Sequence, residues 1–178
     1  MGEVKETKPV LYFSSIIYGS GNAFNFAQEK LLNLFGEIEE ITEEMSFSHT
    51  KYYEDEMGLN LKRKFVLFKS LKNREDLPEV KIKTNEIEKE FSFNGKRTFN
   101  IDPGYISLEN VILATTKNYT HRIYIGKGIY ADLTLIFKSG TFRPLEWTYP
   151  DYASEPIVGI FNKWRKVLKE RLRKEVKC

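Results

Sequence analysis

Residues that form disulfides and metal sites are scarce in this chain of 178 residues. It has one cysteine, at residue 178, and two histidines, His49 and His121. A single cysteine excludes an internal disulfide, and the chain has no set of four zinc ligands. Because chains without disulfides are typical of reducing compartments, we expect a cytoplasmic protein without a structural zinc site.

Long hydrophobic runs are also missing. The early apolar stretch at residues 10–18 is interrupted by Ser14 and Ser15. It falls short of the roughly 18 residues that a membrane-spanning helix needs, and it is too hydrophilic for a signal peptide. Hydrophobic residues still make up 41% of the chain, which supports a buried core and excludes a mostly disordered protein. We expect one domain over residues 8–175, preceded by a disordered tail at residues 1–7.

Charge is distributed unevenly along the chain, although the net charge is only +3. Residues 37–56 hold eight acids and one base, and residues 163–178 hold eight bases and two acids. These two segments either attract each other, recruit a partner, or form separate solvated faces. Lysine and glutamate number 20 each beside a single glutamine, a bias typical of thermophile proteins, although eleven asparagines argue against that origin.

The first hundred residues predict the element order βαββαβ. Strands are expected at residues 10–18, 37–47, 61–69 and 97–101, from apolar or β-branched runs between turn signals. A first helix follows Asn22 as N-cap and stops at Gly36, and a second begins with a capping box at Asp76 and Glu79. This order predicts an α+β fold with a ferredoxin-like core.

The second half predicts three more antiparallel strands, at residues 111–116, 120–125 and 129–137, and a C-terminal helix. Gly126-Lys127-Gly128 is a hairpin signal that sets Ile125 opposite Ile129 and Arg122 opposite Asp132. An aromatic loop at residues 141–152 follows. A final helix opens at Ser154 and Pro156, with its apolar residues on one stripe.

Polar groups are expected to converge at one edge of the sheet. If the first and third strands run parallel, the loop at residues 48–60 and the end of the fourth strand meet there. Arg63 then shares a face with apolar residues, where an unpaired charge is costly, so we expect it to pair with Asp102 or Glu54. Such a pair either locks the two segments together or presents a guanidinium to an anionic ligand.

Two polar residues near that edge admit structural explanations as well. Asp102-Pro103-Gly104 is a favoured turn sequence, which by itself explains Asp102. His121 is expected on the apolar side of its strand, either as a hydrogen-bonded core residue or as a general base beside a carboxylate. The aromatic segment 147–152 either walls a pocket or covers the sheet. His49 stands alone in a loop.

Known nucleotide and RNA motifs match only in part. Gly19-Ser20-Gly21 lacks the Lys-Ser/Thr of a phosphate-binding loop, and a turn with an N-cap explains it. Phe65-Val66-Leu67-Phe68 matches half of an RNA-recognition signature, but Lys62, Arg63 and Lys64 replace the residues of the other half. The sequence therefore disfavours nucleic-acid binding.

Seven short strings together resemble one family. They are YYEDEMG from Tyr52, LKR from Leu61, IDPGY from Ile101, TTK from Thr115, HRIY from His121, GIYA from Gly128 and WTYPDY from Trp147. The chain resembles, over nearly its whole length, an uncharacterised bacterial domain of unknown function whose members are often labelled GTP-binding protein. The resemblance implies no catalytic residues, neither His49 nor the Gly19 loop belongs to its pattern, and the GTP label is unsupported without a phosphate-loop lysine.

The sequence thus predicts a site for an anionic, phosphate-bearing small molecule or nucleotide, with hydrolysis as a further hypothesis. The ligand-binding candidates are Glu54, Arg63, Lys117, Arg122, Tyr149 and Asp151, and the catalytic candidates are His121 and Asp102. The sequence leaves any cofactor unknown, and a divalent metal at Glu54, Glu56 and Asp102 stays open as an alternative because their spacing is not diagnostic. The alternatives are a protein-interaction module that uses the acidic strand or the basic helix, and an RNA-binding domain.

Overall fold

The computed structural model describes residues 2–48 and 52–175, which contain nine strands and four α-helices. In chain order these elements are β1 (Val10–Tyr18), α1 (Gly21–Phe35), β2 (Ile38–Ile41), β3 (Met45–Ser46), α2 (Glu54–Met57), β4 (Lys62–Lys72), a 3-10 turn (Arg74–Asp76), α3 (Leu77–Glu90), β5 (Phe99–Ile106), β6 (Asn110–Thr115), β7 (Arg122–Gly126), β8 (Ile129–Lys138), β9 (Thr141–Pro144) and α4 (Glu155–Glu175). The α+β class and the C-terminal helix are confirmed. The acidic segment divides into β2 and β3, and β9 lies in a segment that was expected to be a loop.

One antiparallel sheet holds the described strands in the order β2-β4-β1-β5-β6-β8-β7, with β3 beside β4 and β9 beside β8. β1 lies between β4 and β5, and all nine of its residues are buried. The expectation that the first and third strands run parallel is wrong, because β1 and β4 are antiparallel neighbours with Ile17 opposite Arg63. After the crossover through α1, β2 runs in the same direction as β1. Because β4 pairs antiparallel with β2, it also runs antiparallel to β1.

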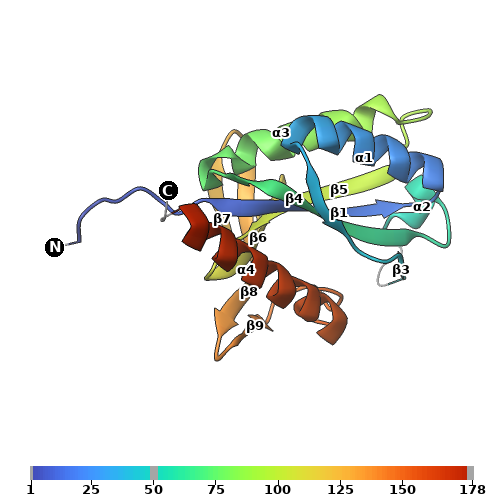
Figure 1. Ribbon diagram of the computed structural model, residues 1–178. Helices are drawn as coiled ribbons and strands as arrows, with labels where there is room; N and C mark the ends of the chain where they lie inside the picture. Colours follow the sequence, from blue (N-terminus) through green and yellow to red (C-terminus); the bar gives the residue numbers. More distant parts are fainter. Residues whose placement is uncertain (1, 49–51, 176–178) are drawn as a thin grey trace.

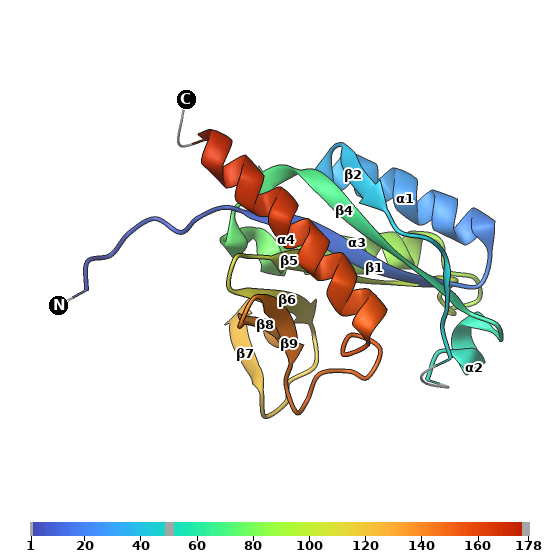
Figure 2. The same ribbon diagram turned by 60° about the horizontal axis from the view of Figure 1, so that its bottom comes forward.

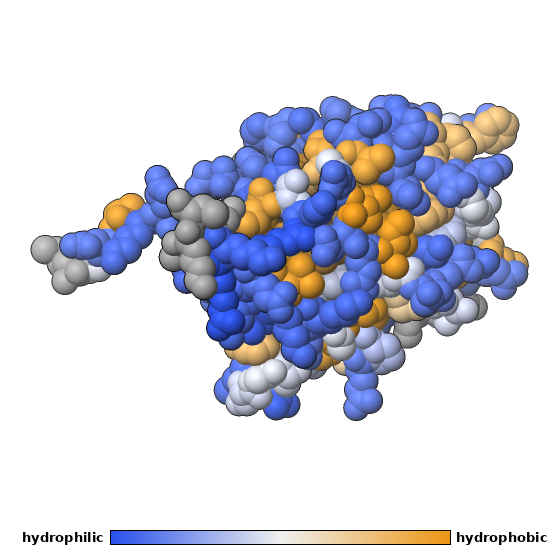
Figure 3. Space-filling view, in the orientation of Figure 1, coloured by the Kyte–Doolittle hydropathy of each residue, from blue (hydrophilic) through white to orange (hydrophobic). Residues whose placement is uncertain are grey.

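Hydrophobic cores lie on both faces of the sheet. α1 and α3 cover one face, where Tyr12 and Phe99 are buried (Figure 1). α4 crosses the other face diagonally (Figure 2), and its Phe161 and Trp164 pack there with Phe13 of β1. Figure 3 shows a mostly hydrophilic outer surface, on which hydrophobic atoms gather between the two helical layers. The apolar stripe predicted for the last helix is therefore confirmed as the cover of this second face.

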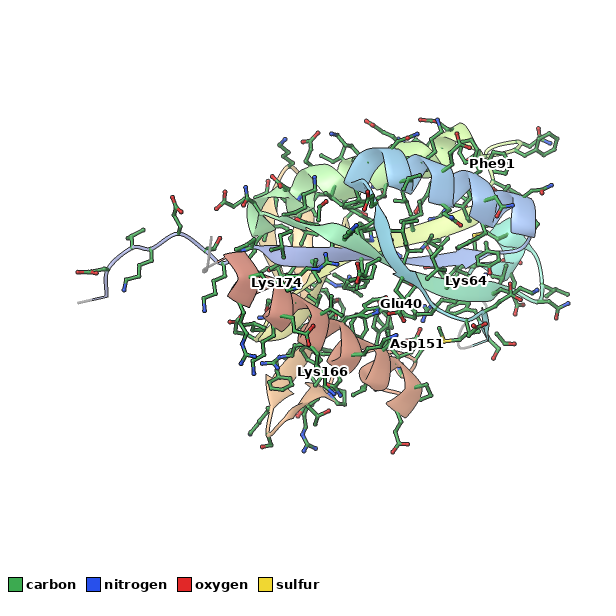
Figure 4. All side chains as sticks on the ribbon, in the orientation of Figure 1. Glu40, Lys64, Phe91, Asp151, Lys166 and Lys174 are labelled. Carbon is green, nitrogen blue, oxygen red and sulfur yellow. The ribbon has the colours of Figure 1, made fainter. Side chains whose placement is uncertain are left out.

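The acidic and basic segments contact each other rather than standing apart. Glu40 of β2 accepts hydrogen bonds from Lys163 Nζ at 2.8 Å and from Trp164 Nε1 at 3.2 Å, and Arg171 pairs with Glu39. Figure 4 shows Glu40 beside α4. Of the three readings of this charge pattern, mutual attraction is the one that the described residues bear out.

The helix starts differ from the sequence predictions. Ser20, and not Asn22, caps α1, since its Oγ accepts the Ala23 N–H at 3.3 Å. The predicted stop at Gly36 is confirmed, with a φ of 86° that suits glycine. The capping box at Asp76 is absent because this residue is already helical, as the end of the 3-10 turn, and its side chain makes no capping hydrogen bond.

The hairpin of β7 and β8 follows the predicted register except at its turn. Arg122 lies opposite Asp132, as predicted. A shift after Tyr124 pairs Gly126 with Ile129, so the expected pairing of Ile125 with Ile129 is wrong. Gly126 has a positive φ, and the register shift beside it makes Gly126, and not Ile125, the partner of Ile129.

Candidate functional site

The sheet opens between β5 and β6. These strands pair only over residues 104–106 and 111–113, although β5 pairs with β1 along its whole length. The expected turn at Asp102-Pro103-Gly104 is wrong, because all three residues lie inside β5. Pro103 has no backbone N–H to offer, and the ladder to β6 ends next to it. The opening is therefore a consequence of where a proline stands in a central strand.

Two charged side chains of α3 satisfy the backbone that β6 leaves unpaired. Lys81 Nζ donates to Ile101 O at 3.0 Å, and Glu88 Oε1 accepts the Ile101 N–H at 2.6 Å. Both residues are buried, at 6% and 5% exposure. Unpaired buried backbone groups would cost stability, so these contacts allow the sheet to remain open. Burial raises the pKa of the Glu88 carboxyl group.

A cavity of 420 Å³ occupies this opening. Its charged lining residues among those described are Arg63, Lys81, Arg97, Lys117 and Arg122 with Glu88, Asp102, Asp132 and Asp151, and its tyrosines are Tyr52, Tyr53, Tyr149 and Tyr152. The volume lies within the roughly 300–1,000 Å³ typical of small-molecule sites. Opposite charges, polar amides and aromatic rings thus surround one space of ligand size.

Arg63 is enclosed at one wall of the cavity. It forms an ion pair with Asp151, and the two side chains are 6% and 7% exposed. Figure 4 shows Asp151 beside the first turns of α4. The predicted partners of Arg63, Asp102 and Glu54, are wrong, since the segment before α4 folds back over the start of β4. The pair joins residues 88 positions apart in the chain.

Aromatic rings surround the same guanidinium. The Arg63 Cζ atom lies 4.5, 5.5 and 5.4 Å from the ring centres of Phe47, Phe65 and Tyr152. Its Nε has no hydrogen-bond partner among the described residues. Burial raises the pKa of the Tyr152 hydroxyl, so this tyrosine stays neutral at physiological pH.

Arg97 connects α2, α3 and β5 on a second wall. Its Nε and Nη2 donate to the Glu56 carboxylate at 2.8 and 2.7 Å, and Nη1 donates to Glu88 at 3.1 Å and to Asn100 at 2.7 Å. The hydrogen bonds from Arg97 lower the pKa of Glu56. Burial raises the pKa of Tyr53, whose ring centre lies 5.9 Å from the Arg97 Cζ atom. This fork of bonds holds Arg97 in place and neutralises its charge.

Arg122 and Asp132 form a third wall on the β7–β8 hairpin. Asp132 Oδ2 accepts from Arg122 Nε at 2.9 Å and lies 3.2 Å from His121 Nε2. The His121 ring stacks on Trp147 with centres 5.0 Å apart. Arg122 Nη2 donates to the Tyr149 hydroxyl at 3.1 Å, which directs that hydroxyl proton elsewhere. His121 therefore has a carboxylate partner, as its general-base reading required, but it is not a lining residue.

Among the described residues, Lys117 has no ion-pair partner, and Asp102 has only a long ion pair with Lys81. Lys117 Nζ lies 3.3 Å from the Tyr52 hydroxyl and 4.5 Å from that ring centre, with no carboxylate in ion-pair range. Asp102 Oδ2 accepts from Asn100 Nδ2 at 2.9 Å, but Oδ1 has only Lys81 Nζ, at 3.7 Å. The Asp102 side chain is 32% exposed. These two side chains retain the capacity to bind a ligand.

The structure brings together most of the residues that the sequence singled out. Those that line the cavity are Arg63, Asp102, Lys117, Arg122, Tyr149 and Asp151. His121 does not line the cavity, but it contacts Asp132, which does. Glu54 lies in α2 and does not line the cavity. His49 lies outside the described residues.

Sequence reasoning missed the contribution of α3. Leu77, Lys81, Thr84 and Glu88 are spaced by four, three and four residues and are all buried. This is the spacing of a helix face that points at the protein interior. Two charged residues on such a face are a sequence signal for a buried polar site.

Residues 2–48 and 52–175 contain neither a cluster of metal ligands nor a helix that could span a membrane. No group of three His, Cys, Asp or Glu side chains there is arranged to hold a metal ion. Glu56, one of the residues considered for a metal, is bound to Arg97 instead. In this part of the chain no helix combines the length and apolarity needed to cross a membrane.

Comparison with known proteins identifies a family without an assigned activity. The model of the family described as Domain of unknown function (DUF4416) matches residues 8–167. No curated protein and no solved structure matches the chain significantly. The matched region contains every residue that lines the cavity. The chain therefore belongs to the DUF4416 family.

Proposed function

We propose that the cavity between β5 and β6 binds a small anionic molecule, with a phosphate group as the anion. The observation that carries this proposal is Lys117, which lines the cavity without a carboxylate partner among the described residues. The lining arginines are each bound to an acidic residue, and Lys81 donates to the Ile101 carbonyl oxygen and lies 3.7 Å from Asp102. Lys117 is therefore the lining cation that gives up the fewest existing interactions when an external anion binds.

The balance of charge favours an anion over a cation as the ligand. Asp151 is neutralised by Arg63, and Asp132 by Arg122. An incoming cation would have to compete with these internal partners, because a carboxylate already paired offers little further attraction. An incoming anion meets no such competition at Lys117.

The tyrosines point to the same preference. Cations attract aromatic rings, and a cluster of tyrosines is a common site for a cationic ligand. Here the rings of Tyr52, Tyr53 and Tyr152 lie against cations of the protein itself, Lys117, Arg97 and Arg63. The protein thus uses its own charges on these rings, which disfavours a quaternary ammonium or similar ligand.

Hydroxyl donors that line the same cavity as Lys117 suit a phosphate. Because the Tyr149 oxygen accepts from Arg122, its own proton is available to a ligand oxygen. Thr116 also lines the cavity. Phosphate oxygens accept several hydrogen bonds at once and take lysine as a point charge. A lysine and hydroxyl donors in one cavity are therefore suited to recognise such a group.

Binding rather than hydrolysis is the activity that the geometry supports. Proton transfer by both Asp102 and His121 would require them to reach the same reacting group. Asp102 lines the cavity, whereas the His121 ring is held between Asp132 and Trp147 and is not a lining residue. Hydrolysis by this pair therefore lacks the required convergence.

The two alternative functions have less support. The acidic strand β2 and the basic helix α4 pair with each other, which leaves fewer charges for a protein partner. Phe65, from the segment that matches half of an RNA-recognition signature, is fully buried with Phe13 in the core beneath α4. Buried rings cannot stack on bases without removal of that helix.

Isothermal titration with inorganic phosphate, sugar phosphates and nucleotides tests the proposal. We expect at least one phosphate compound to bind and Lys117→Ala to weaken its binding about tenfold or more. Lys127→Ala is the matched control, since Lys127 pairs with Glu79 and does not line the cavity. Absence of binding by every phosphate compound, or equal weakening by both variants, would refute the proposed function.

A further inference from the structure

We infer that the ligand carries hydroxyl groups beside its phosphate, as a phosphorylated sugar or polyol does. This inference rests on the proposed function and concerns the opposite side of the same cavity. Asp102 is the group that carries it. Its Oδ1 atom accepts no hydrogen bond within the described residues, although the side chain is one third exposed to the cavity. A carboxylate oxygen in that position is an acceptor for a ligand donor.

Lys117 and Asp102 are placed so that one ligand molecule can contact both. If the β5–β6 register continued past Gly104 and Leu113, Thr115 would stand opposite Asp102 and Lys117 opposite Asn100. Asp102 lies in β5 and Lys117 follows the end of β6 at Thr115, so the two groups come from segments on either side of the opening. A ligand with its phosphate at Lys117 spans the gap toward Asp102. The cavity of 420 Å³ is far larger than a phosphate group alone, so it has room for the remainder of such a molecule.

A neutral donor fits Asp102 better than a charged one. Lys81 Nζ lies 3.7 Å from Asp102 Oδ1 and is held there by its bond to Ile101 O. An ammonium group at the same carboxylate would be repelled by Lys81, because like charges at that distance disfavour each other in a partly buried site. A hydroxyl group donates to the carboxylate without this repulsion.

Other polar side chains nearby match a ligand with several hydroxyls. Asn85 of α3 lines the cavity with an amide that both donates and accepts. Thr115 and Thr116 line it from the facing side. A hydroxyl group also both donates and accepts, so it pairs with amide and hydroxyl side chains in either direction. The lining therefore complements a polyhydroxyl compound on both sides of Asp102.

Titration calorimetry with matched phosphate monoesters tests the inference. The probes are ribose 5-phosphate, which has hydroxyls, and monobutyl phosphate, which has none. We expect the wild-type protein to bind ribose 5-phosphate about tenfold or more tightly than monobutyl phosphate, as a hydrogen bond to a charged acceptor allows. Asp102→Asn, which keeps the shape and loses the charge, should bring the two affinities within about threefold of each other. Glu109→Gln, at the other end of the same two strands, should retain the wild-type ratio.

The outcomes separate this inference from the proposed function. Lys117→Ala should weaken both esters by a similar factor, which reports on the phosphate contact alone. If both esters bind the wild-type protein equally, or if Asp102→Asn keeps the full ratio, the hydroxyl inference is wrong and the phosphate site stands. If neither ester nor inorganic phosphate binds, the proposed function fails and the inference fails with it. The wild-type ratio needs no variant, so the test does not depend on how well Asp102→Asn folds.

Discussion

Replacing Asp151 by asparagine would leave the Arg63 guanidinium charged and without its ion-pair partner at a site nearly closed to water. The two side chains are 6% and 7% exposed, so solvent offers little compensation. Removing one partner of a buried ion pair costs about 3–5 kcal/mol. The rings of Phe47, Phe65 and Tyr152 remain in place and attract the cation. We therefore expect the lower end of the range, about 3 kcal/mol.

Urea unfolding, monitored by tryptophan fluorescence, measures this loss of stability. In a thermal unfolding experiment, a loss of about 3 kcal/mol corresponds, for a protein of this size, to a fall of about 6–12 °C in the unfolding midpoint. Glu37→Gln is the control, since Glu37 pairs with Lys69 at 2.5 Å on the surface. It should leave the unfolding midpoint unchanged, because exposed ion pairs contribute little.

A double variant distinguishes a lost ion pair from a damaged site. Arg63→Met combined with Asp151→Leu replaces both charges by apolar groups of similar length. Apolar replacement of a buried pair is often neutral or stabilising, so most of the loss should be recovered. A cost below about 1 kcal/mol for Asp151→Asn, or a double variant as unstable as the single one, would contradict the reasoning.

Further predictions concern the opening of the sheet and the charges around it. Gly104→Ala should destabilise the protein by about 1–3 kcal/mol in urea unfolding, since a Cβ there would lie 2.9 Å from Phe13 Cζ and would meet the Ile112 carbonyl oxygen. Gly159→Ala inside α4, with open space around it, should instead stabilise by about 0.5–1 kcal/mol. Because burial raises the pKa of Glu88, the folded state holds its proton more tightly, and stability is lost as pH rises from the usual glutamate pKa through the raised one. Glu88→Gln should lack this loss when unfolding is compared from about pH 4 to about pH 8. Arg97 lowers the pKa of Glu56, so this pair stabilises fully above the usual glutamate pKa and loses its contribution as pH falls through the lowered one. Glu56→Gln should be less stable than wild type near pH 7, with a gap that closes in acid, and a gap of constant size would contradict this.

Several features were readable from the sequence because their causes are local. The run of β1, apolar except for Ser14 and Ser15, marks a strand that is buried on both faces. The spacing of Ile157, Phe161, Trp164 and Leu168 marks the buried side of α4. Glycines in the β7–β8 turn set the register of Arg122 against Asp132, except for one residue at the turn itself.

Other features depend on contacts between segments far apart in the chain. Asp102-Pro103-Gly104 has a strong turn preference, but pairing with β1 along all of β5 outweighs it. The position of the cavity then depends on two side chains of α3 that bind the backbone of Ile101. Neither contact follows from local preference, since each needs another segment to be in place first.

Periodicity and turn chemistry are local properties, and they were enough to predict the α+β class, the main elements and a set of polar residues. Which charges neutralise one another depends on how distant segments pack together. Arg63 meets Asp151 and not Asp102, because the chain before α4 returns to the start of β4. An ion pair forms wherever the packed backbone brings two charged groups together, and nothing in the neighbouring residues encodes that meeting. The availability of Lys117 and Asp102 for a ligand therefore becomes visible only when the ion pairs of the other described lining residues are known.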